Sequence, residues 1–78
     1  MTYIATFFSH FGAIRFKKLC DGAGWPAVLM PVPRDLSSSC GTCVRFEGEC
    51  PDSPSDEVEQ IVETTPSGYV AVYRAEDI

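Results

Sequence analysis

Long hydrophobic runs are missing from this chain. Arg15, Lys17 and Lys18 interrupt its N-terminal half, and no apolar run approaches the roughly 20 residues that a helix needs to cross a membrane. The first residues also lack the basic segment followed by an apolar one that marks a secretory signal peptide. We therefore expect a cytoplasmic protein that does not associate with a membrane.

Histidine is scarce, and so are closely spaced pairs of cysteines. His10 is the single histidine, and only Cys40 and Cys43 of the four cysteines stand close together. In a reducing compartment, cysteines are expected to be thiols, redox pairs or metal ligands rather than permanent disulfides. A metal site that also used Cys20 and Cys50 would lack a second close pair, so we expect no metal. No complete catalytic set is evident, which argues against an independent enzyme.

Basic residues are rare in the second half of the chain. Residues 47–78 contain one basic and nine acidic residues, whereas residues 1–46 contain five basic and two acidic ones. The whole chain has a formal net charge of −5. Nucleic acid is therefore an unexpected partner, because its phosphates need a basic surface. The acidic helix that we predict in this half is expected to form a solvated face or a docking surface for a basic partner.

The 78 residues are enough for one domain, which we assign to residues 1–78. Strands are predicted where β-branched and aromatic residues concentrate, at residues 2–8, 26–32, 42–47 and 69–74. Prolines flank the second of these strands, which places it at a sheet edge. A core of this size is only marginally stable alone, so we expect a homodimer formed through an edge strand or an exposed sheet face.

Two helices are predicted between these strands. The first spans residues 10–20, with Ser9 as its N-cap and apolar residues at helical spacing. The second follows the prolines at positions 51 and 54, with Ser53 as its N-cap. Its apolar stripe would consist of Val58, Ile61 and Val62.

The predicted order, strand, helix, strand, strand, helix, strand, is that of the ferredoxin-like βαββαβ sandwich. This α+β fold has a four-stranded antiparallel sheet with two helices on one face. Its first two strands are parallel, so the end of the second lies at the same sheet edge as the start of the first helix. We therefore expect Cys40 to lie near Ser9 and His10, and Cys50 to lie at the opposite edge.

The segment MPVPRDLSSSCGTCVRF, residues 30–46, contains the candidate site. Serine hydroxyls and a glycine allow backbone amides to turn toward one point, where they can stabilise a thiolate or a bound anion. Cys40 is accordingly the candidate reactive thiol. The candidate ligand-binding residues around it are Arg34, Ser37, Ser38, Ser39 and Gly41.

Three neighbouring residues have alternative interpretations. Cys43 completes a CxxC spacing and is either a resolving thiol or a core residue, since side chains three apart on a strand face opposite sides. His10 is either a proton shuttle for Cys40 or a surface residue. Arg34 either holds an anionic species or pairs with Asp35.

The N-terminal strand and helix, followed by PVPRDLSSSCG and VRFE, resemble the small family of putative selenium/sulfur carrier proteins, long described as a domain of unknown function. The resemblance covers nearly the whole chain and is most specific over residues 31–46. It implies that Cys40 is the carrier thiol of a protein that handles sulfur or selenium. The chain differs from the family pattern at Cys43, where an apolar residue is more usual.

Two functions remain open on this basis. In the first, Cys40 holds sulfur or selenium as a persulfide or selenosulfide, taken from a donor protein and given to an acceptor protein. No cofactor is expected other than this covalently carried atom. In the second, the chain is a non-catalytic ferredoxin-like regulatory or interaction module. It would bind a small ligand or partner near the serine-rich loop, with Cys40 structural.

Overall fold

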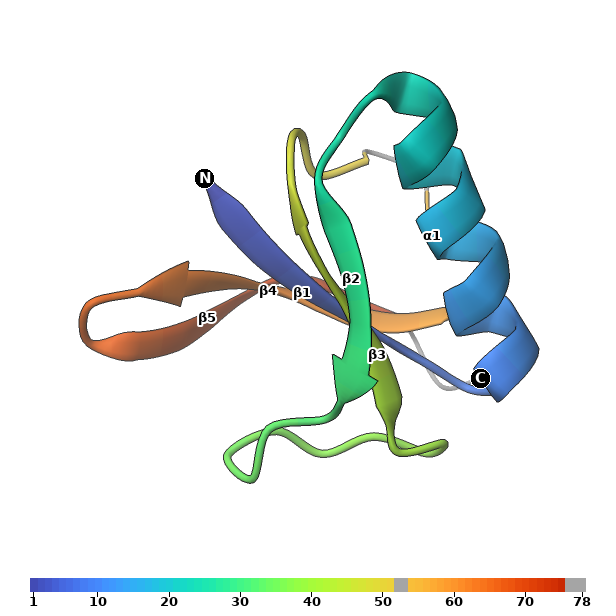
Figure 1. The fold of residues 1–78 in the computed structure, drawn as a ribbon. Coiled ribbons are helices and arrows are strands. Elements are labelled where there is room, and N and C mark those ends of the chain that lie inside the picture. The colour runs from blue at the N-terminus through green and yellow to red at the C-terminus, as the bar shows by residue number, and fades with distance from the viewer. Residues whose placement is uncertain (52–53, 76–78) are drawn as a thin grey trace.

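The computed structural model describes residues 1–51 and 54–75, which form five strands and one helix (Figure 1). These elements, in chain order, are β1 (Thr2–Phe7), α1 (His10–Ala23), β2 (Ala27–Pro31), β3 (Thr42–Glu47), β4 (Val58–Thr65) and β5 (Gly68–Arg74). No helix in the described part of the chain is long and apolar enough to cross a membrane.

The strands form one sheet in the order β2-β3-β1-β4-β5, and all neighbouring strands are antiparallel. Strands β1 and β2 both pair with β3, so they run in the same direction. Helix α1 connects them and packs on one face of the sheet (Figure 1). The first half is therefore the predicted split βαβ unit, and β2 lies at an edge as predicted. Association through this edge remains a prediction.

The prediction for the second half is wrong. The α+β class is confirmed, but the described residues contain one helix and five strands instead of two helices and four strands. The predicted second helix is strand β4, which forms a hairpin with β5 that extends away from α1 (Figure 1). Its predicted cap, Ser53, lies outside the described residues.

A β-bulge explains this error. Thr6 pairs with Gln60 but Phe7 pairs with Val58, so Glu59 is an extra residue on β4. Because of this extra residue, Val58 and Ile61 both face α1, although positions three apart normally point to opposite faces of a strand. The bulge thus reproduces the spacing expected of a helix.

Helix α1 has clear signals at both ends. The Ser9 side chain accepts a hydrogen bond from the Gly12 amide at 3.3 Å, which confirms the predicted N-cap. Gly24 ends the helix in the left-handed conformation, with φ of 78°. The helix continues three residues beyond its predicted end at position 20.

The sheet has an apolar cluster on each face. The larger cluster lies under α1 and includes Phe7, Phe16 and Phe46. The smaller cluster, on the opposite face, contains Ile4, Cys43 and Val62 and is partly covered by residues of the loop between β2 and β3. That loop contains the candidate site.

Candidate functional site

The loop between β2 and β3, residues 32–41, is closed at its base by backbone contacts. The Val32 amide donates to the Gly41 carbonyl at 3.1 Å, and Gly41 has a φ of 74°, which favours glycine. Val32 and Leu36 pack against the smaller cluster, so the loop folds over the sheet face opposite α1. These contacts anchor the serine-rich segment between Leu36 and Gly41.

Cys40 lies at the end of this loop and is half-buried against the rim of the larger cluster. Its amide donates to the Ser38 hydroxyl at 3.4 Å, and its thiol donates to the Thr42 carbonyl at 3.4 Å. The Ser38 hydroxyl in turn donates to the Phe7 carbonyl at 3.5 Å, at the end of β1. Hydrogen bonds to Ser38 and to Thr42 therefore fix the position of the thiol.

His10 is close to this thiol, as the topology predicts. Its Nδ1 atom lies 3.2 Å from the Thr42 hydroxyl, while the Thr42 carbonyl accepts the Cys40 thiol. Both side chains therefore contact the first residue of β3. His10 is exposed at the first position of α1, where solvent can exchange its proton.

Glu59 is the residue at this site that sequence reasoning missed. Its carboxylate accepts hydrogen bonds from the Ser39 amide at 3.1 Å, the Ser39 hydroxyl at 2.7 Å and the Thr6 hydroxyl at 3.3 Å. The predicted helix placed Glu59 on a solvated acidic face. In the structure, the bulge in β4 turns Glu59 toward the loop. Its carboxylate binds the amide and the hydroxyl of Ser39, which were expected from the sequence to bind an anion beside the thiol.

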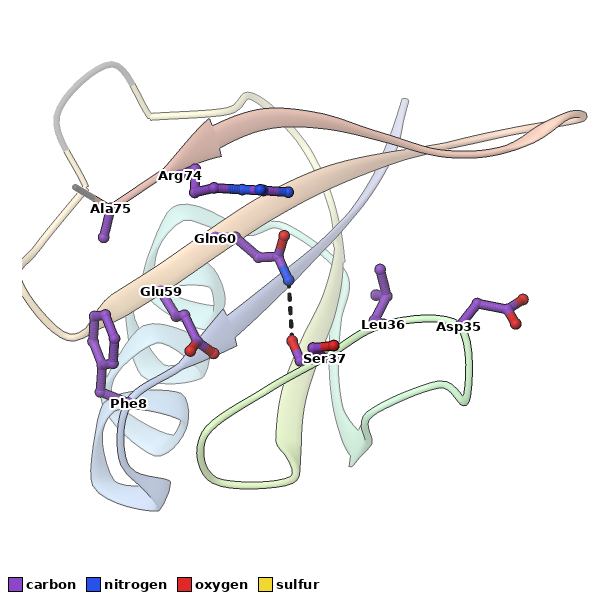
Figure 2. Close-up of a pocket in the computed structure, with 8 residues that line it drawn as sticks. All are labelled: Phe8, Asp35, Leu36, Ser37, Glu59, Gln60, Arg74 and Ala75. Atoms are coloured by element: carbon purple, nitrogen blue, oxygen red, sulfur yellow. Dashed lines mark hydrogen bonds between the residues drawn. The ribbon is translucent and has the colours of Figure 1, made fainter. Parts of the chain in front are cut away.

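Gln60, the next residue on β4, also holds the loop. Its side-chain amide donates to the Ser37 carbonyl at 3.1 Å (Figure 2). Beside this contact lies a hollow of about 390 Å³ between the loop, β4 and the end of β5. Figure 2 shows its lining residues, which are Phe8, Asp35, Leu36, Ser37, Glu59, Gln60, Arg74 and Ala75.

Arg34 is exposed in the turn that the Leu36 amide closes on the Pro33 carbonyl at 3.0 Å. Within residues 1–51 and 54–75 it forms no hydrogen bond or ion pair, including with Asp35. Its guanidinium is available to solvent and to ligands at the surface of the loop.

Cys43 has different surroundings from Cys40. It is fully buried in the smaller cluster, and its thiol is 3.7 Å from the Pro31 carbonyl. Burial, with a smaller contribution from Cys40, raises the pKa of the Cys43 thiol to about 11. These contacts favour the core interpretation of Cys43 over the resolving one.

The other two cysteines are remote from this loop in the fold. Cys50 follows the end of β3, opposite the end that Cys40 precedes, as predicted. Cys20 is buried on the sheet-facing side of α1, as the sequence also indicates, and burial raises the pKa of its thiol. In the part of the chain that the structure describes, no group of three or more potential metal-binding side chains is gathered.

We predict that Cys40 is alkylated first among the four thiols. Cys20 and Cys43 are buried with raised pKa values, so few of them ionise near pH 8. Cys50 is half-buried and lies outside the serine-rich loop that contains Cys40. Peptide mapping after brief alkylation at several pH values measures the order. Slower labelling of Cys40 than of Cys50 would contradict the prediction.

Comparison with known protein families adds an independent finding. A family model described as "Putative Se/S carrier protein-like" matches residues 2–74. The chain belongs to this Se/S carrier-like family. The match includes all six elements and the loop with Cys40, and a carrier family implies partner proteins. No curated protein and no solved structure matches the chain.

Proposed function

We propose that this protein carries sulfur or selenium on Cys40, as a persulfide or a selenosulfide. The observation that supports this function is the setting of the thiol, which is half-buried at the surface and donates to Thr42, the residue whose hydroxyl contacts His10. Cys20 and Cys43 are buried in apolar clusters, where a bound cargo has no room. Membership in the Se/S carrier-like family agrees with this assignment.

Loading is a sulfur exchange in which bonds and electrons balance. The Cys40 thiolate attacks the terminal sulfur of a persulfide on the donor protein. A sulfur–sulfur bond forms at Cys40 as the donor's own sulfur–sulfur bond breaks, and the donor leaves as a thiolate. His10 takes the proton that the Cys40 thiol loses, and passes it to solvent.

Delivery follows the same chemistry with an acceptor thiolate as the attacking group. The outer sulfur of the Cys40 persulfide moves to the acceptor, and Cys40 leaves as a thiolate. A selenosulfide exchanges its terminal selenium in the same way. In this proposal Arg34 attracts the anionic cargo or its carrier from the surface of the loop, and Cys43 is a core residue that is not needed for release.

The experiment is incubation with a cysteine desulfurase and cysteine, followed by intact-mass analysis. The proposal predicts a gain of the mass of one sulfur atom, which dithiothreitol removes because it reduces persulfides. Omission of cysteine is the control and should leave the mass unchanged. A protein that never gains this mass would contradict the carrier function.

A second candidate function has its own observation. The hollow beside Ser37 is lined by both apolar and charged side chains, and its volume of about 390 Å³ suits a small ligand. An interaction module that binds such a ligand would use Arg74 and Gln60 and would not need a reactive Cys40. Ligand binding that is unchanged in a Cys40→Ser protein, without any sulfur loading, would favour this alternative.

A further inference from the structure

The loop that contains Cys40 is tied to β4 by two consecutive side chains. Glu59 binds the amide and the hydroxyl of Ser39, and Gln60 binds the carbonyl of Ser37. Figure 2 shows both side chains directed from β4 toward the loop. Within the described residues, these are the side-chain hydrogen bonds that join the serine segment to the second half of the chain.

The Glu59 contacts are the strongest of this set. A carboxylate that accepts from an amide and a hydroxyl forms charge-assisted hydrogen bonds, which are about twice as strong as neutral ones. A third donor, the hydroxyl of the fully buried Thr6 on β1, also forms a hydrogen bond to this carboxylate and holds it in place. Glu59 is itself the bulged residue, so a local irregularity of β4 gives its side chain this position.

We propose that Glu59 is the positioning residue of the carrier thiol, an inference that rests on the proposed function of Cys40. Ser39 directly precedes Cys40, so the two bonds from Ser39 to Glu59 fix the backbone that leads into the thiol. The carboxylate also occupies donors that would otherwise bind a passing anion. It therefore orients the thiol toward a donor protein without taking part in the exchange.

The test compares Glu59→Gln with Glu63→Gln. Glutamine keeps the size of Glu59 but removes its charge and replaces one acceptor oxygen with an NH₂ group, so the two charge-assisted bonds from Ser39 cannot both form. Glu63 is a matched control because it is half-buried on the same strand and its side chain forms no hydrogen bond or ion pair with another described residue.

Two measurements on Glu59→Gln are expected to move in opposite directions. Alkylation of Cys40 by iodoacetamide should become about fivefold faster, because a released loop exposes the thiol to a small reagent. Sulfur loading from a desulfurase should become about tenfold slower, because exchange between proteins needs a fixed thiol. Ser39→Ala should shift both measurements in the same directions, and the double variant should match Glu59→Gln alone.

A purely structural role for Glu59 would give a different pattern. Labelling of the buried Cys20 and Cys43 would then rise together with that of Cys40. That pattern overturns the proposal, as does a Glu59→Gln protein with the same alkylation and loading rates as Glu63→Gln. If Cys40→Ser still loads sulfur, the carrier function fails, while the alkylation comparison still decides the role of Glu59 in holding the loop.

Discussion

A Cys40→Ser protein is expected to gain no sulfur when it is incubated with a cysteine desulfurase and cysteine. The substitution removes the sulfur that forms the new bond and leaves the serine-rich loop and its contacts to β4 in place. A hydroxyl at position 40 can still donate to the Thr42 carbonyl, so the loss reflects chemistry instead of unfolding. Intact-mass analysis measures the loading, and circular dichroism checks the fold.

Cys50→Ser is the matched control for this experiment. Cys50 is also half-buried at the end of β3 that is farther from the loop, and its thiol lies 3.7 Å from the Pro51 carbonyl. Its replacement should leave loading at the wild-type level. A Cys40→Ser protein that loads as much sulfur as the wild-type protein would remove Cys40 as the carrier thiol.

Phe46→Ala is expected to reduce the free energy of unfolding by about 3–5 kcal/mol, as measured for large aromatic truncations in cores. Phe46 is 1% exposed and lies at the centre of the larger cluster. Its ring centroid is 5.4 Å from that of Tyr3, 5.1 Å from that of Phe16 and 6.3 Å from that of Trp25. Removal of the ring leaves a cavity between β3 and α1.

Urea denaturation followed by tryptophan fluorescence measures this loss, because Trp25 stacks on Phe46. Phe11→Ala is the control, since Phe11 is 69% exposed on α1 and should change the free energy of unfolding by less than about 0.5 kcal/mol. Similar stability losses in the two variants would show that the core is not organised around Phe46.

The first half of the fold could be predicted because its local signals agree with each other. Ser9 and Gly24 mark the two ends of α1, and the β-branched segment at residues 42–47 becomes strand β3 with the predicted limits. The direction of the βαβ connection then places the end of β2 near the start of α1. This rule is sufficient to bring His10 and Cys40 to the same residue, Thr42.

The second half could not be predicted from periodicity alone. The spacing of Val58, Ile61 and Val62 fits a helix, but it also fits a strand with one extra residue that faces two apolar clusters. The β-branched ending of this segment, at Thr64 and Thr65, is a signal in favour of a strand. The helix prediction gave these two threonines too little weight.

The same error hid Glu59. On a helix, an acidic residue in an acidic segment has no reason to contact a serine 20 residues earlier, and a single sequence contains no signal for the bulge. The structure identifies Glu59 only because β4 pairs with β1 and turns this carboxylate toward Ser39. Long-range strand pairing therefore determines which residues of the second half reach the site.

The most direct test of the central claim is to locate the carried sulfur in the wild-type protein. After loading, the persulfide is trapped by alkylation, and trypsin cleavage after Arg34 and Arg45 gives one peptide with both Cys40 and Cys43. Fragment ions of this peptide distinguish the two cysteines. The account predicts the added sulfur on Cys40 alone, and its presence on Cys43 or Cys50 with Cys40 unmodified would contradict it.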